Sequence, residues 1–128
     1  MSAHPTGTPA PIAVLSDLIF GARIRAAAAA SGIPVALSLI PDRIVEAVRD
    51  GARAAFIDLD TRATDPVAVI ARIRADPASA STPIVAFASH VRTDLIEAAR
   101  AAGAYRVLAR GAFARLLPGL VLDSGADG

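Results

Sequence analysis

Ala54-Ala55-Phe56-Ile57-Asp58-Leu59-Asp60 is the stretch that decides the fold, because it joins a short apolar run to carboxylates. An earlier run, Ile12-Ala13-Val14-Leu15, is followed in a similar way by Asp17. Short, nearly continuous apolar runs are typical of strands that are buried on both faces of a parallel sheet. At the carboxyl ends of neighbouring strands, Asp17 and Asp58 would form an acidic pocket, which suits a hard divalent cation or a phosphoryl group.

The rest of the chain alternates between strand-like and helix-like segments. Strands are expected at Ile12–Ser16, Val35–Leu39, Ala54–Asp58, Ile84–Ala88 and Arg106–Ala109. Helices are expected at Leu18–Ser31, at Pro41–Asp50, from Asp65-Pro66 to Asp76-Pro77, from Asp94 to Gly103 and at Phe113–Leu122. This alternation predicts a single α/β domain, a doubly wound parallel sheet of the flavodoxin-like type with strand order 2-1-3-4-5. In that order, strands 1 and 3 are neighbours, and ligands bind outside their carboxyl ends.

Three local signals define the ends of the helices. Asp65 followed by proline predicts a helix N-cap, and Asp94 with Glu97 three residues later predicts a capping box. Pro118 lies in the middle of the last apolar helical segment, so we expect that helix to be short or broken.

The composition limits the class of protein. The chain has 128 residues, a hydrophobic share of 54%, a net charge of +1 and no cysteine, which predicts one domain at residues 12–122 with a flexible leader at 1–11 and a flexible tail at 123–128. No stretch is densely basic, which argues against a nucleic-acid partner. No apolar run reaches membrane-spanning length and the leader does not read as a signal peptide, so we expect no membrane association and a cytoplasmic location.

Motifs for enzyme chemistry are missing from the sequence. It has no P-loop, no dinucleotide-binding glycine motif, no lysine and only two histidines. Ser89-His90 stands outside any nucleophile elbow, and adjacent residues rarely form the hydrogen-bonded pair of a catalytic triad. We therefore expect no enzymatic activity.

Over about Pro11–Leu122, the chain resembles the CheY-like receiver domains of two-component response regulators. The segments that carry the resemblance are Phe56–Asp60, Asp65, Ile73–Pro77, Pro83–Phe87 and Gly103-Ala104. The resemblance implies that Asp58 is the phosphoacceptor. It also implies a Mg²⁺ site made by Asp17, Asp58 and Asp60, with Asp60 contributing its main-chain carbonyl.

The chain departs from the pattern of these receiver domains at several functional positions. Ser16 replaces the first acidic residue, and Ala88 replaces the hydroxyl residue, with Ser89 one step later. Arg110 replaces the lysine, and Gly111 replaces the proline that follows it. Val107 replaces the aromatic switch residue. Arg110 and Ser89 remain candidates for phosphoryl contact. A guanidinium cannot copy the compact charge of an ammonium group, and a phosphoryl group without its hydroxyl partner gains little differential energy. The resemblance is therefore to a degenerate member, a pseudo-receiver.

The last third of the chain is the candidate partner face, because the fourth helix and the fifth strand and helix form the usual partner face of receiver-like domains. It is rich in arginine and poor in acidic residues, which suits docking of an acidic partner or self-association as a homodimer; the alternative is an ordinary solvated helix face. The candidate residues are Arg92, Arg100, Tyr105, Arg106 and Phe113.

Three functions follow from these residues. The first is signalling by protein–protein contact with a histidine kinase or a downstream signalling protein, with phosphorylation weak or absent. The second is a functional stand-alone response regulator that is phosphorylated on Asp58 with Mg²⁺ as cofactor. The third is a small-ligand-binding or enzymatic domain that uses the cleft around Asp17, Asp58 and Arg110.

Overall fold

The five expected strands form one parallel sheet in a computed structural model that describes residues 9–89 and 92–123. Its order is β2-β1-β3-β4-β5, as the sequence predicts. The strands are β1 (Ile12–Leu15), β2 (Val35–Ser38), β3 (Ala54–Asp58), β4 (Ile84–Ala88) and β5 (Arg106–Ala109). The expected leader at 1–11 and tail at 123–128 lie largely outside the described residues.

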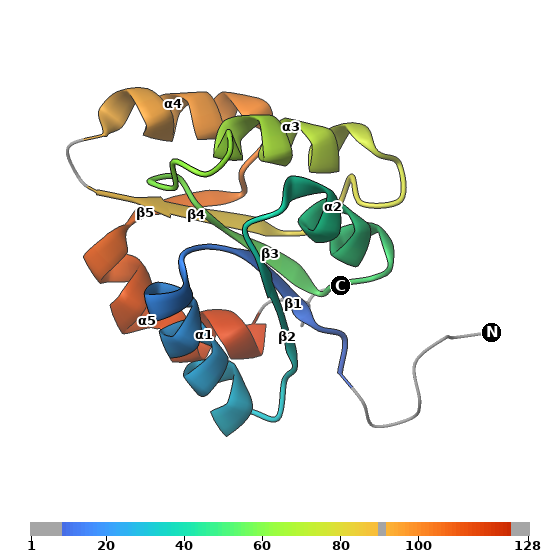
Figure 1. Ribbon diagram of the computed structural model, residues 1–128, viewed down its shortest axis with the longest axis vertical. Helices are drawn as coiled ribbons and strands as arrows, with labels where there is room; N and C mark the ends of the chain where they lie inside the picture. Colours follow the sequence, from blue (N-terminus) through green and yellow to red (C-terminus); the bar gives the residue numbers. More distant parts are fainter. Residues whose placement is uncertain (1–8, 90–91, 124–128) are drawn as a thin grey trace.

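Helices cover both faces of the sheet (Figure 1). They are α1 (Leu18–Ala30), α2 (Pro41–Arg49), α3 (Pro66–Ala75), α4 (Thr93–Ala102) and α5 (Arg110–Asp123). α1 and α5 lie on one face, and α2, α3 and α4 lie on the other. Of the helices within the described ranges, none combines the length and the apolarity that crossing a membrane requires.

Each face of the sheet has its own apolar core, because successive strand residues point to opposite faces. Ala55 and Ile57 of β3 pack with α2, α3 and α4, whereas Ala54 and Phe56 pack with α1 and α5. All four phenylalanines of the chain lie in the second core, where the rings of Phe87 and Phe113 stack with centroids 4.2 Å apart.

The last helix corrects an expectation. α5 is an unbroken helix of 14 residues that begins at Arg110, not a short or broken one at Phe113–Leu122. Phe113, Leu117, Leu120 and Val121 recur at helical spacing and are all buried, so apolar packing holds the helix on both sides of Pro118. Pro118 itself is exposed, and its missing N–H removes one hydrogen bond that this packing offsets.

Apart from α5, the helix ends agree with the sequence except at the start of α4. Asp65 caps α3 by accepting from the amide of Ala68 at 3.2 Å, as expected. α4 begins one residue before Asp94, with Arg92 as the N-cap and no side-chain hydrogen bond there, so the expected capping box is wrong. Asp94 instead lies in the first turn, where its charge still complements the helix dipole.

Candidate functional site

Asp58 lies at the centre of the site, as the last residue of β3, with 1% of its surface exposed. β3 is flanked by β1 and β4, so the carboxylate leaves the sheet between two other strands. The hydroxyl of Ser16 donates to Oδ2 of Asp58 at 3.2 Å, and the amide of Asp60 donates to Oδ1 at 2.9 Å. Both carboxylate oxygens therefore accept a hydrogen bond from a neighbouring loop.

Arg110 brings the positive charge to this site. It is the first residue of α5, directly after β5, so the chain turns here at the same edge of the sheet as Asp58. Its Nη2 donates to both oxygens of Asp58 at 2.9 Å each and lies 3.5 Å from Oδ2 of Asp60. One guanidinium is thus shared by two carboxylates, one of them buried.

Aromatic rings hold the other side of the Arg110 guanidinium. Its Cζ lies 4.6 Å from the ring centroid of Phe20 and 5.4 Å from that of Phe87. Phe87 is the register partner of Asp58 on the neighbouring strand, so its ring is fixed by the sheet. A cation over an aromatic face adds about 0.5 to 1 kcal/mol at sites that are partly open to water. The side chain of Arg110 is therefore held from two directions.

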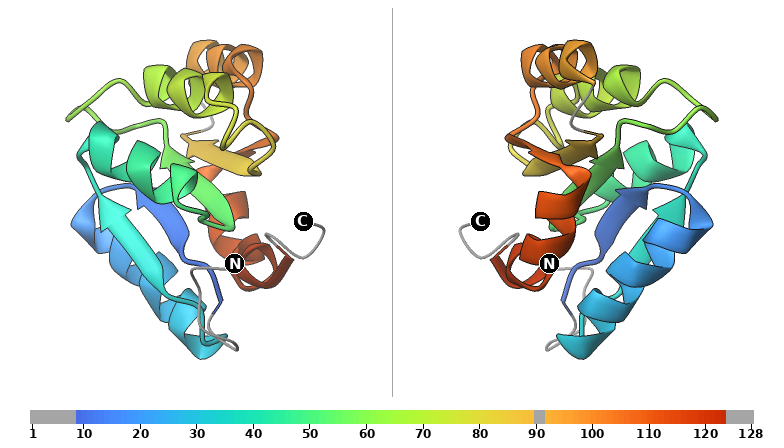
Figure 2. Two further views of the ribbon diagram at one scale, coloured as in Figure 1. Left: turned by 90° about the vertical axis from the view of Figure 1, so that its right-hand side faces the viewer. Right: turned by 90° about the vertical axis from the view of Figure 1, so that its left-hand side faces the viewer.

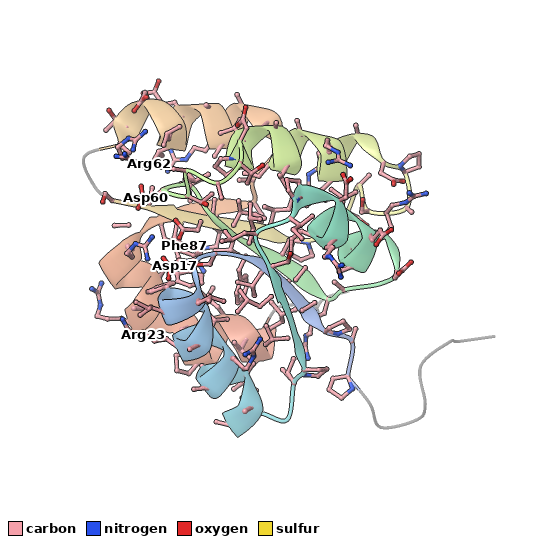
Figure 3. The ribbon with its side chains drawn as sticks, in the orientation of Figure 1. Asp17, Arg23, Asp60, Arg62 and Phe87 are labelled. Carbon is pink, nitrogen blue, oxygen red and sulfur yellow. The ribbon has the colours of Figure 1, made fainter. Side chains whose placement is uncertain are left out.

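Asp60 and Ser89 connect the ends of β3 and β4. The amide of Ser89 donates to Oδ2 of Asp60 at 3.0 Å. The Asp60 carboxylate is thus hydrogen-bonded within the protein. Ser89 contributes its main-chain amide to the site, not its hydroxyl. Figure 3 shows Asp60 and Phe87 at the same end of the sheet as Asp17.

Asp17 is at the edge of this constellation. It is the N-cap of α1, and its Oδ1 accepts from the amide of Phe20 at 2.7 Å. It is exposed and lines a shallow hollow of about 540 Å³ with Leu18, Ile19, Phe20 and Arg110. Its carboxylate serves the start of α1, so the structure does not join it to Asp58 and Asp60.

The expected magnesium ligands can be tested against this arrangement. Mg²⁺ takes oxygen ligands in near-ideal octahedral geometry. Over residues 9–89 and 92–123, no three acidic, histidine or cysteine side chains gather where they could hold a metal. Asp58 and Asp60 instead face the Arg110 guanidinium, a cation of the wrong kind to share a metal site. In this arrangement the carboxylates of Asp58 and Asp60 are paired with Arg110, and the Mg²⁺ site with the main-chain carbonyl of Asp60 stays a prediction.

The residues of the candidate partner face differ in their exposure to solvent. Arg100, Tyr105 and Arg106 are exposed, Tyr105 to 72%, and Arg92 is half-buried at the start of α4. Phe113 is fully buried and stacks on Phe87, so its placement on a partner face is wrong. The helical phase of α5 turns it inward.

Some site residues were not recognised in the sequence. Ser16, which the sequence presents as a replacement for an acidic residue, donates to Asp58, and no sequence pattern connects Phe20 and Phe87 with Arg110. The predicted strand order could have identified Phe87, because it makes β4 a neighbour of β3 and so places Phe87 beside Asp58.

Arg74 is a half-buried cation outside the site. Its guanidinium donates to the carbonyl of Gly103 at 2.8 and 3.1 Å, to that of Ala80 at 2.6 Å and to that of Thr82 at 2.9 Å. Desolvation lowers the pKa of Arg74 from its usual value, although arginine stays protonated at neutral pH. Arg74 therefore fastens the end of α3 to the turn between α4 and β5.

Comparison with known proteins agrees with this fold. The sequence matches no protein-family model, and no curated protein matches it significantly. Among solved structures, the chemotaxis protein CheY4 of Vibrio cholerae aligns with a TM-score of 0.77 at 12% identity, over 92% of this chain and 99% of its own. A response regulator from Thermotoga maritima aligns with a TM-score of 0.72 at 20% identity, over 93% of this chain and 98% of its own.

A third similar structure carries a metal. The receiver domain of the sensor histidine kinase PA1611 from Pseudomonas aeruginosa, solved with a magnesium ion coordinated in its active-site cleft, aligns with a TM-score of 0.72 at 20% identity, over 91% of this chain and 100% of its own. At such identities the likeness concerns the backbone. The chain has the CheY-like fold of response regulator receiver domains.

Proposed function

We propose that this chain is a receiver-like signalling domain that acts through protein–protein contact, with Asp58 phosphorylated weakly or not at all. The observation that carries the proposal is the pairing of Arg110 with Asp58, in which Nη2 of Arg110 donates to both carboxylate oxygens. The partner is a histidine kinase or a downstream signalling protein. The role is non-enzymatic, and its proposed location is the cytoplasm.

The chemistry of phosphoryl transfer supports a weak acceptor. An oxygen of Asp58 would have to attack phosphorus with a free lone pair, yet each oxygen accepts two hydrogen bonds, one of them from Arg110, and the side chain is 2% exposed. Freeing them requires Arg110 to leave. Its departure would strand a buried carboxylate without its counter-charge and would break the contacts with Phe20 and Phe87.

The end of β4 supports weak coupling in the same way. Ala88 is fully buried and has no hydroxyl, and Ser89 offers its amide to Asp60. A phosphoryl group on Asp58 would find no hydroxyl from Ala88, so one source of coupling between Asp58 and the end of β4 is missing. A modification shifts an equilibrium only by its difference in free energy between the two states.

An amide NMR titration tests the proposal, with Mg²⁺ alone and then with Mg²⁺ and beryllofluoride. We expect the amides of Asp58, Asp60 and Ser89 and those of α4 to keep their positions when beryllofluoride is added. The Asp58→Asn variant is the control for shifts that arise elsewhere. Shifts that spread from Asp58 into α4, and that vanish in this variant, would identify a phosphorylated response regulator instead.

A further inference from the structure

β5 has one side without a partner strand. It is the last strand of the sheet and, among the described residues, pairs only with β4. The right-hand view of Figure 2 shows β5 facing the viewer between α4 and α5, with no other element in front of it. An open edge of this kind is a template for one more strand, which pairs through main-chain hydrogen bonds.

The hydrogen bonds of β4 identify which part of β5 faces outward. Amides of β3 and of the residue after it donate to the carbonyls of Pro83 and Phe87, so alternate residues of β4, including Val85, bond to β3. Val85 is the register partner of Arg106. Because bonds alternate along a parallel pair, Arg106 bonds to β4, and Val107 turns its N–H and C=O to the open side.

Positive charge surrounds this open edge. A hollow of about 490 Å³ lies between the end of α4 and β5, lined by Arg100, Ala104, Tyr105, Arg106, Val107 and Leu108. No acidic residue lines it. Within the described part of the chain, neither Arg100 nor Arg106 takes part in an ion pair. The two guanidiniums and the ring of Tyr105 are thus available to a ligand.

We propose that β5 binds an extended acidic segment of a protein partner as a sixth strand. This inference rests on the proposed function, which requires a protein partner. It adds the chemistry of that partner and its mode of binding. Val107 N–H and C=O would pair with the main chain of the segment. The arginines would then select for carboxylates on it.

The two faces of β5 define the acidic pattern. Val107 packs with the core under α4, whereas Leu108 packs with the core under α5, and Arg106 shares the parity of Leu108. Consecutive carboxylates on the added strand would therefore meet Arg106 on one face and Arg100 on the other. A second copy of this chain would bring two arginine-bearing edges together, so an acidic partner fits the edge better.

Amide hydrogen exchange is the direct test, because it reports on single main-chain groups. The probe is a short blocked peptide in which pairs of glutamates alternate with single valines. In the free protein, the Val107 amide should exchange much faster than the Arg106 amide. With saturating peptide, we expect the Val107 amide to become protected by about tenfold or more. An unchanged Val107 amide under saturating peptide would overturn the proposal.

Matched variants test the role of charge. Arg100→Glu together with Arg106→Glu should weaken peptide binding about tenfold or more, because two favourable charge contacts become repulsive. Arg25→Glu with Arg43→Glu changes two exposed arginines on α1 and α2 and should leave binding unchanged. Equal affinity for a peptide with lysine in place of glutamate would contradict the proposal. Concentration-dependent dimerisation that protects Val107 without peptide would also contradict it, in favour of a second copy.

This test can fail without the proposed function failing. Beryllofluoride reports on Asp58, whereas the peptide reports on the β5 edge. If neither causes a response, the signalling role without phosphorylation stands and the acidic-strand partner is wrong. If beryllofluoride shifts Asp58 and α4 while the peptide protects Val107, the edge site stands and the inactive phosphoacceptor is wrong.

Discussion

Arg110 carries a planar guanidinium that can satisfy several neighbours at once. Its Nη2 reaches Asp58 and Asp60, and its guanidinium carbon lies over two phenylalanine rings. An ammonium group on a lysine stem offers no plane to stack on the rings. The arginine therefore acts as a fixed internal counter-ion for the end of β3.

Arg110→Ala should lower the free energy of unfolding by about 2 to 3 kcal/mol, because it leaves the buried Asp58 carboxylate without its counter-charge. Urea denaturation would measure the change. Arg115→Ala, an exposed site on the same helix, should cost less than about 0.5 kcal/mol. Adding Asp58→Asn to Arg110→Ala should recover about 1 kcal/mol or more, since no charge is then stranded. Simple additivity of the two changes would contradict the pairing.

At the scale of elements, the turn from α4 into β5 is fixed by a glycine and an arginine. Gly103 ends α4 with φ at +118°, in the left-handed region that favours glycine. A Cβ at this position would lie 2.8 Å from Cγ of Arg74, whose guanidinium donates to the Gly103 carbonyl. The position of β5 therefore depends on a contact with α3.

Gly103→Ala should destabilise the protein by about 2 to 3 kcal/mol, from the strained φ and from the displacement of Arg74. Gly32→Ala is a control with φ at +71° and open space around the added Cβ, so it should show the conformational cost alone, about 1 kcal/mol. Thermal or urea unfolding separates the two. Equal losses would show that the contact with Arg74 contributes nothing.

At the scale of the whole molecule, the core under α1 and α5 is organised around the four phenylalanines. Phe113 contacts each of the other three rings, stacking on Phe87 and meeting Phe56 edge-on at 5.3 Å and Phe20 at 5.9 Å. Arg110 lies over two of the same rings, so the candidate site and this core share residues. Packing of α5 and formation of the site are therefore coupled.

Phe113→Ala should lower the free energy of unfolding by about 3 to 5 kcal/mol, through lost burial and the cavity left behind. Phe113→Leu should cost less because it keeps most of the apolar volume. Leu122→Ala, at a side chain that is 56% exposed, should change stability by less than about 0.5 kcal/mol. A loss below about 1 kcal/mol for Phe113→Ala would contradict its burial in the core and would favour the partner face that the sequence predicts for it.

The sequence by itself determined the elements, their order in the sheet and the edge at which Asp58 lies. Apolar runs, helix caps and glycine stops are local signals, and short connections between parallel strands leave few arrangements. One expectation about these elements was wrong. Pro118 predicted a short or broken last helix, but apolar packing along α5 keeps the helix continuous.

Only the tertiary structure decided which charges meet. Asp17 turned to the start of α1, Arg110 folded back onto Asp58, and Phe113 faced inward. These outcomes depend on the phase of a helix, the register of strands and the reach of long side chains between segments far apart in the chain. Sequence spacing indicates which face of α5 is apolar, but it does not set the strand register or the reach of Arg110, because these are chosen by packing and by pairing of buried charges once the sheet has formed.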